Sequence, residues 1–180
     1  MRADAQRNYE RILAAAADAF AADGPEASLN DIARRAGVGP GTLYRHFPNR
    51  QALQAAIVGD RVDALCARAD ELATTDPDSA LRQWLHAFLV HARTDHGLGG
   101  ATLAGDDLGF DCHARIHGAA ANMLALAQRE GGARADVTPS QVIQLVVGIA
   151  LAPARSDAAL DEPHRLLEIV IDGLYTSPST

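Results

Sequence analysis

Residues 28–50 read SLNDIARRAGVGPGTLYRHFPNR, and this stretch decides the fold of the N-terminal part of the chain. Ser28 followed by Asp31 is typical of a helix start. The hydroxyl can accept from the free N–H groups of a first turn, and the acid complements the helix dipole. The spacing therefore predicts a short helix over 29–36.

A glycine turn joins this helix to the next one. Gly37 permits the positive φ of a tight turn, and Gly39 with Pro40 begins a second short helix that runs through His46. Two short helices joined in this way are typical of a helix-turn-helix, whose second helix enters the major groove of DNA. A helical hairpin whose aromatic residues merely pack is the alternative interpretation.

The second helix carries residue types suited to DNA. Small residues at its start allow close approach to a groove, and the polar residues that follow can reach bases or phosphates. The small residues are Gly39, Pro40, Gly41 and Thr42. Tyr44 and His46 can donate hydrogen bonds, whereas Arg45 and Arg50 can neutralise phosphate charge.

The rest of the chain also has helical periodicity, and no stretch has the two-residue alternation of a strand. Apolar residues recur at helical spacing between Gly, Pro and capping residues. The pattern predicts an all-α fold of about nine helices. Six of them have predicted ranges: Tyr9 to Gly24, 29–36, 40–46, the Asn49 cap to about Thr74, 101–104 and 111–130. The other three are predicted by their starts, at Ser79, at the Thr138 capping box and at Pro163.

Composition excludes several classes of protein. The 180 residues include 48% hydrophobic residues, enough for a packed core, and two cysteines, too few for a disulfide scaffold. Polar residues interrupt every apolar run, so no membrane span is expected, and a reducing cytoplasm is the expected location. The net charge is −7, but residues 1–50 carry seven Arg against six acids, so a local basic cluster can still bind a polyanion.

No catalytic signature stands out, and we expect no enzyme, no cofactor and no metal. Cys112 with nearby His113 has no group that would orient the pair. His113 and His117 share a helix face, but a third ligand at a recognisable spacing is missing, so solvated histidines are the simpler interpretation. As polar anchors they could instead line an effector pocket, which we predict from Trp84, Phe88, His91, His113, His117 and Met123.

Residues 9–53 resemble the N-terminal domain of TetR/AcrR-family transcriptional regulators. The matching residues are Ile12-Leu13, Ala16, Phe20, Gly24, Ser28-Leu29, Asp31-Ile32-Ala33, Ala36-Gly37-Val38, Gly41 to Arg50, and Leu53. The family often has Ser or Thr where this chain has Gly39, and Lys where it has Arg50. The first departure removes a hydroxyl cap, and the second keeps the charge.

The resemblance implies a homodimer that binds a palindromic operator on double-stranded DNA and represses until a small molecule enters its C-terminal domain. By position, Thr42, Tyr44 and His46 would touch DNA from the second helix of the motif, and Arg50 and Ser28 would meet phosphates. The implied division is a helix-turn-helix DNA-binding domain over 1–50 and a ligand-binding and dimerisation domain over 51–180. A helical small-molecule or metal-binding protein without a DNA role is the alternative.

The resemblance also places the dimer interface on the last two helices. The segment 142–151 is apolar almost all round, which favours cover from a second chain, although a central helix of a monomeric bundle would have the same pattern. The predicted interface residues are Val142, Val146, Ile149, Leu167, Ile171 and Leu174.

Overall fold

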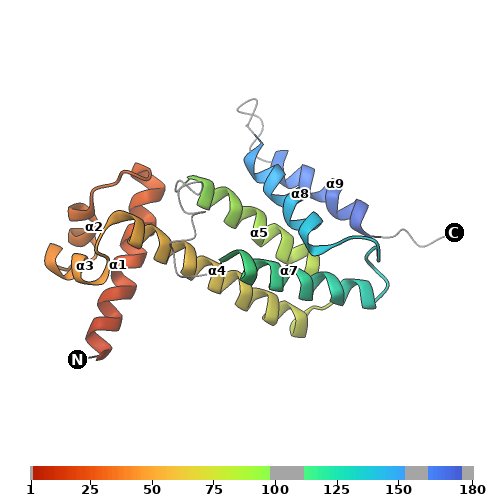
Figure 1. Cartoon of the computed structure of the whole chain (residues 1–180), viewed down its shortest axis with the longest axis horizontal. Helices are drawn as coiled ribbons and strands as arrows, with labels where there is room; N and C mark the ends of the chain where they lie inside the picture. The colour runs from red at the N-terminus through yellow and green to blue at the C-terminus, as the bar shows by residue number, and fades with distance from the viewer. Residues whose placement is uncertain (1, 98–111, 153–161, 176–180) are drawn as a thin grey trace. The chain divides into compact units, whose positions relative to one another are not determined.

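The computed structural model describes residues 2–97, 112–152 and 162–175. Among these residues the regular secondary structure is helical, apart from an isolated antiparallel bridge between Ala133 and Tyr175. With the labels of Figure 1, the helices are α1 (Arg2–Asp23), α2 (Leu29–Arg35), α3 (Pro40–His46), α4 (Arg50–Thr75), α5 (Ala80–Gly97), α7 (Cys112–Arg129), α8 (Pro139–Leu151) and α9 (Glu162–Leu174). The all-α prediction is confirmed, and the predicted helix over 101–104 lies outside the described residues.

Capping residues set several helix starts, as the sequence predicts. The N–H of Asp31 donates to the Ser28 hydroxyl at 3.4 Å before α2. The N–H of Ala52 donates to Asn49 Oδ1 at 2.8 Å before α4. Thr138 and Gln141 form a reciprocal capping box before α8. α1 begins earlier than predicted, because its first two turns are polar and carry no periodic apolar signal.

The described residues form two compact units. One contains residues 2–61 and 94–97, and the other contains 62–93, 112–152 and 162–175. α4 contributes residues to both units, whereas the sequence places the domain division at residue 50, where this helix begins.

The N-terminal unit is a three-helix domain completed by the start of α4 (Figure 1). Its core brings together one apolar face from each helix, with Ile12 on α1, Ile32 on α2, Leu43 on α3 and Leu53 on α4, all fully buried. Burial of each such side chain contributes about 1.5–3 kcal/mol, so the core fixes the angle of α3 against the other helices.

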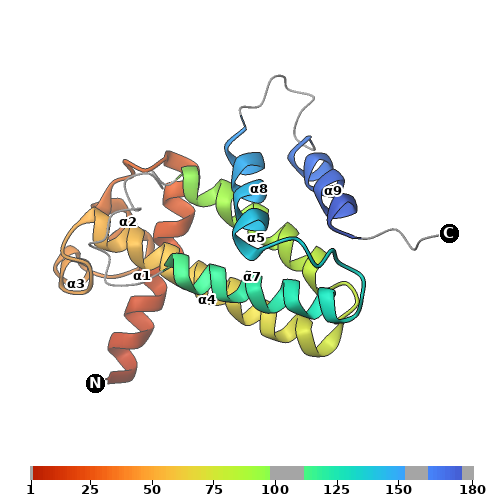
Figure 2. The same cartoon turned by 45° about the vertical axis from the view of Figure 1, so that its right-hand side comes forward.

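The second unit is a helical bundle with its own core. Trp84 of α5 is fully buried, and its indole N–H donates to the carbonyl oxygen of Leu65 on α4 at 3.2 Å. α7 lies alongside the second half of α4 (Figures 1 and 2), where Arg115 forms an ion pair with Asp63. In the part of the chain that the structure describes, no helix is long and apolar enough to cross a membrane.

Candidate nucleic-acid interface

α3 has one face in the core and the other in solvent. Leu43 and the following Phe47 are buried, while Tyr44 is 46% exposed and Arg45 is exposed beside it. Gly39 and Gly41 are also exposed, with open space where side chains would stand, and Thr42 is half-buried at the edge of this face. The predicted contact residues at the start and middle of α3 therefore share an accessible surface.

The turn before α3 is held rigidly. Gly37 has φ of +65°, as predicted, and its N–H donates to the carbonyl oxygen of Arg34 at 3.0 Å. Arg11 of α1 donates to the carbonyl oxygen of Gly37 at 3.3 Å. This contact was not predicted, because its partners lie far apart in sequence. α3 is thus presented by a fixed scaffold, which is what groove recognition requires.

His46 is placed differently from Tyr44. Its side chain is half-buried at the last turn of α3, with its ring edge-on to Tyr9 of α1 at a centroid distance of 6.0 Å. The ring also lies 6.2 Å from that of Phe47. His46 therefore joins α3 to α1, and its contact with DNA stays a prediction.

Arg50 has partners inside the protein. Its Nη1 donates to the carbonyl oxygens of Pro25 at 3.0 Å and Ala27 at 2.5 Å, and its Nε lies 3.8 Å from the carboxylate of Glu26. Gln54, one turn further along α4, donates to the same Pro25 oxygen at 3.2 Å. The Arg50 guanidinium thus contacts the α1–α2 loop, and its predicted contact with a phosphate stays a prediction.

Ion pairs inside the N-terminal unit limit the positive charge that α2 and α3 can offer to a phosphate. Arg34 and Arg35 of α2 form ion pairs with Asp31 at 2.8 Å and Asp23 at 3.0 Å. Arg45 forms no ion pair with any residue that the structure describes, so its whole charge faces solvent. Ser28 is exposed at the start of α2 with its hydroxyl engaged in the helix cap.

The residues predicted to line an effector pocket are found in two environments. Trp84, Phe88 and Met123 are buried in the core of the second unit, where the Trp84 and Phe88 rings stack at 5.4 Å. His91 is half-buried beside Phe88, at a ring distance of 6.3 Å.

His113 and His117 lie on the exposed face of α7. His117 Nε2 is 3.2 Å from the Ser140 hydroxyl of α8. The effector pocket on these six residues stays a prediction.

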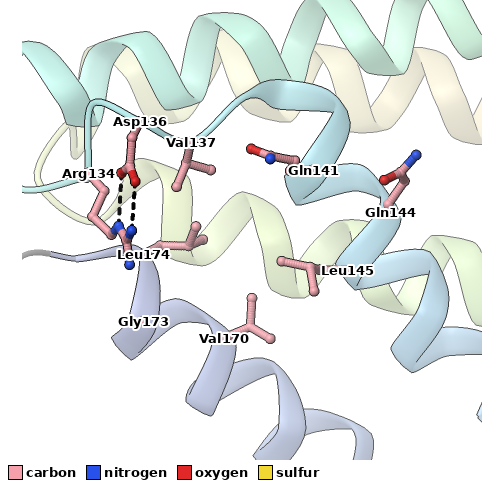
Figure 3. Close-up of a pocket in the computed structure, with 9 residues that line it drawn as sticks. All are labelled: Arg134, Asp136, Val137, Gln141, Gln144, Leu145, Val170, Gly173 and Leu174. Carbon is pink, nitrogen blue, oxygen red and sulfur yellow. Dashed lines mark hydrogen bonds and ion pairs between the residues drawn. The ribbon is translucent and has the colours of Figure 1, made fainter.

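A cavity of about 580 Å³ lies between the α7–α8 loop, α8 and α9 (Figure 3). Leu145 of α8 and Val170 of α9 point into it, and Arg134 and Asp136 form a two-pronged ion pair with distances of 2.9 and 2.7 Å at its end. The hydrogen bond from Arg134 lowers the pKa of Asp136. Sequence reasoning missed this cavity, because it depends on how the loop folds back against α9. Its lining residues are Arg134, Asp136, Val137, Gln141, Gln144, Leu145, Val170, Gly173 and Leu174.

The residues predicted to form the dimer interface lie mostly in the chain's own core. The buried ones are Val142, Val146, Leu167, Ile171 and Leu174, while Ile149 is half-buried. Because α8 is apolar almost all round, the sequence could not show which of its faces meets the core. The apolar side chains that α8 and α9 leave exposed are Leu145, Leu151, Leu166 and Ile169.

Metal-binding side chains and cysteines are two further features that the sequence raises. No three His, Cys, Asp or Glu side chains converge on a metal-sized space within residues 2–97, 112–152 and 162–175. Cys66 and Cys112 are free thiols. Burial, followed by the charge of Asp70, raises the pKa of Cys66, so this thiol is held away from its reactive thiolate form.

Two family descriptions match most of the chain. Residues 12–57 match the description "Bacterial regulatory proteins, tetR family", and residues 76–176 match "Transcriptional regulator SbtR-like, C-terminal domain".

Solved structures are similar over nearly the whole chain. The TetR transcriptional regulator SCO0520 from Streptomyces coelicolor is 35% identical with a TM-score of 0.78, and the match covers 94% of this chain and 99% of that one. A TetR transcription regulatory protein from Mycobacterium vanbaalenii is 36% identical with a TM-score of 0.76, covering 97% and 99%.

Among curated relatives, the transcriptional repressor LfrR of Mycolicibacterium smegmatis is 39% identical over 89 residues, which is 47% of this chain and 46% of LfrR. The chain spans about half the length of the curated relatives it matches first. Two matched family regions and two full-length structural relatives above 30% identity lead to one conclusion. The chain belongs to the tetR family of bacterial regulatory proteins.

Proposed function

We propose that this protein is a ligand-responsive, sequence-specific DNA-binding regulator that represses from a palindromic operator as a homodimer. The observation that carries the proposal is the exposed face of α3, where Tyr44 and Arg45 stand beside Gly39 and Gly41 on a rigid support. A basic and aromatic helix face with small residues at its start suits the major groove.

Each residue of this face has a distinct role. The two glycines let the helix start approach the groove closely, and the Thr42 hydroxyl and Tyr44 phenol supply hydrogen bonds to base edges or phosphates. Arg45 supplies the charge that releases counterions from the duplex. Ser28 adds a phosphate contact from the start of α2, and Arg50 acts indirectly by holding the α1–α2 loop that positions Ser28.

The proposed dimer rests on the apolar surface of α8 and α9 and on the two-fold symmetry of a palindromic operator. Leu145, Leu166 and Ile169 are 46%, 37% and 68% exposed, respectively. A second copy of the same surface would bury these side chains, and a two-fold pair of recognition helices would read a palindrome. The interface is therefore proposed on these exposed residues rather than on the buried ones of the same helices.

Repression ends when a small molecule shifts the dimer to a conformer whose two recognition helices no longer match successive major grooves of the operator. An effector can shift that equilibrium only by its difference in affinity for the two conformers. The repressor role is supported by family membership and by the relative LfrR, which is named a transcriptional repressor.

The proposal is tested by measuring the affinity of the chain and of Tyr44→Ala for a duplex that the chain enriches from a random library. We expect Tyr44→Ala to lose about 1–3 kcal/mol of binding free energy at fixed salt, while remaining dimeric by sedimentation. Asn122→Ala, at an exposed position of α7, is the matched control and should bind as the unmodified chain does. Unchanged affinity of Tyr44→Ala would contradict this α3 assignment, whereas a helical protein without a DNA role would enrich no duplex at all.

A further inference from the structure

Hydrogen bonds fix the walls of the cavity between the α7–α8 loop, α8 and α9. The backbone N–H of Arg134 in the loop donates to the carbonyl oxygen of Leu174 at the end of α9 at 2.8 Å. The side-chain amide of Gln128 on α7 donates to the carbonyl oxygens of Arg134 at 2.8 Å and of Val137 at 3.1 Å. The loop is thus tied to α7 and α9, and the cavity of about 580 Å³ beside it is preformed. This volume lies within the range of about 300–1,000 Å³ that is typical of small-molecule sites.

Four aliphatic side chains form the apolar part of the cavity. Leu145 of α8 and Val170 of α9 point into it from two facing helices (Figure 3). Leu174 is buried and Val137 is half-buried beside them. A ligand that covers these side chains removes apolar surface from water, which is the main favourable contribution to binding in apolar sites. The cavity therefore suits a molecule with an aliphatic part.

Gln141 of α8 adds a hydrogen-bond donor to the cavity. Its Oε1 accepts from the backbone N–H of Thr138 at 2.9 Å in the capping box. Because a backbone N–H requires an acceptor, this bond shows which end of the side-chain amide is oxygen, and Nε2 is the donor that is left. Among the residues that the structure describes, Gln141 Nε2 has no hydrogen-bond partner.

Arg134 and Asp136 close one end of the cavity with a pair that has no net charge. The guanidinium uses two of its five N–H groups on the carboxylate, at 2.9 and 2.7 Å, which leaves donors for a further acceptor. The hydrogen bond from Arg134 lowers the pKa of Asp136, so both members of the pair are charged near neutral pH. A charged ligand would lose hydration here without an opposite charge that is free to pair with it. Donors without excess charge favour a neutral acceptor, such as a carbonyl oxygen.

We propose that this cavity binds a small uncharged molecule that combines an aliphatic chain with a carbonyl group, such as a medium-chain amide or ester. The chain lies against Leu145 and Val170, and the carbonyl oxygen accepts from Gln141 Nε2. Arg134 offers a second donor at the end of the cavity. Binding is reversible and involves no covalent step. The site is separate from the effector pocket predicted with Trp84.

The cavity overlaps the proposed dimer surface at one residue. The helices α8 and α9 run in opposite directions, so the start of α8 lies beside the end of α9 (Figures 1 and 2). The cavity is at this end, where Gln141 and Leu174 line it. Of the three apolar residues proposed for the dimer, Leu145 lines the cavity, whereas Leu166 and Ile169 do not. The inference therefore depends neither on dimerisation nor on DNA binding.

The test compares three probes that share a six-carbon chain and differ in their polar group: N-hexylacetamide, heptanoate and hexylammonium. Each is titrated into the full chain, with methyl groups and glutamine amides labelled for NMR. We expect N-hexylacetamide to bind at least about fivefold more tightly than either charged probe and to shift the methyl resonances of Leu145 and Val170. Equal affinity of the three probes would overturn the proposal, because an apolar patch alone does not distinguish them. Tighter binding of heptanoate or hexylammonium would overturn it as well.

Gln141→Glu separates the donor from the capping role of this residue. The variant keeps the acceptor oxygen of the capping box and replaces only the donor nitrogen. The affinity for N-hexylacetamide should fall at least about fivefold, and hexylammonium should become the preferred probe. Denaturant titration should show a stability close to that of the unmodified chain. Unchanged probe affinities would overturn the assignment of the carbonyl group to Gln141.

Gly173→Leu fills the cavity without removing a contact. Gly173 lines the cavity on α9, and open space surrounds the position where a side chain would stand. The added side chain should lower the affinity for N-hexylacetamide at least about tenfold. Gly118→Leu, at an exposed glycine of α7 with the same open space, is the matched control and should bind as the unmodified chain does. Unchanged affinity in Gly173→Leu would place the bound probe elsewhere and overturn the proposal.

Discussion

At the scale of single residues, Arg45 provides the exposed positive charge of the proposed DNA interface on α3. Its side chain is exposed on α3 and has no ion-pair partner among the described residues, whereas the two arginines of α2 are paired. We expect Arg45→Ala to weaken binding at all sequences and to lower the slope of log affinity against log salt by about one. Fluorescence anisotropy at several salt concentrations measures both quantities.

Arg129→Ala is the control for this measurement, because it removes the same charge from an exposed position in the last turn of α7. Its salt slope should equal that of the unmodified chain. A slope that Arg45→Ala leaves unchanged would remove Arg45 from the phosphate contacts.

Gly37 is the residue whose backbone matters most to the motif. A side chain at φ of +65° is strained, and an added methyl group would meet the guanidinium of Arg11. We expect Gly37→Ala to lower the free energy of unfolding by about 1–3 kcal/mol, measured by denaturant titration. Gly41→Ala, in the same unit with open space around it, should leave stability unchanged or slightly higher. Equal stability of the two variants would contradict this reading of the turn.

Local chemistry in the sequence was enough to predict the turn at Gly37, the caps at Asn49 and Thr138, and the exposed character of α3. It could not show that Arg50 also contacts carbonyl oxygens of a loop more than twenty residues earlier. A charged side chain next to a recognition helix has the same local pattern whether it meets a phosphate or ties down a loop. The contact with the loop depends on how distant segments fold together, which the local sequence does not show.

At the scale of helices, α8 shows what the spacing of apolar residues can predict and what it cannot. Its helical state and capping box can be predicted from the sequence. Because apolar residues lie on every side, the sequence does not show which face of α8 packs against the core. Val146 is fully buried in the chain's own core, so an arginine there would unfold the unit and could not report on dimerisation. Ile169 of α9, at 68% exposed, is the better position.

We expect Ile169→Arg to shift the protein from dimer to monomer, because a charge would have to be desolvated in the proposed interface. Sedimentation velocity at several protein concentrations measures the change. Asn122→Arg places the same charge on the exposed face of α7 and should leave the dimer intact. A dimer of unchanged strength in Ile169→Arg would place the interface elsewhere.

Glu168 of α9 accepts a hydrogen bond from His86 and forms an ion pair with Arg82, both on α5, and this contact gives a prediction about pH. Because of these partners, the pKa of Glu168 in the folded chain is below the ordinary value near 4.5, so the ionised form stabilises the fold above that pH, and this contribution disappears as pH falls through the folded-state pKa. The side chain is partly exposed, so the contribution is below about 1 kcal/mol.

The unfolding free energies of the unmodified chain and Glu168→Gln should therefore differ at pH 7 and converge below about pH 4.5. Chemical denaturation across this range measures the difference. Glu130→Gln, which removes an exposed carboxylate without an ion pair in the described part of the chain, should show no comparable convergence. A constant difference across the range would mean that the charge of Glu168 does not stabilise the contact.

At the scale of the whole molecule, the described residues form two units with separate cores. The core of the N-terminal unit supports α3, and the second unit carries the exposed apolar residues of α8 and α9 on which the dimer is proposed. The sequence could predict the helix-turn-helix, because it depends on a short local motif, whereas the dimer surface on α8 and α9 stays a proposal. The sequence could not predict the cavity beside Arg134 or the contact of His86 with Glu168, since both need the packing of distant segments.

The most direct measurement is a selection of bound sequences from a random duplex library, with the full chain at near-physiological salt. The account predicts enrichment of a palindrome whose half-sites are centred about one helical turn apart, bound by two chains. A folded, dimeric protein that enriches no sequence, or only an asymmetric one, would contradict the proposed reading of an operator by paired α3 helices.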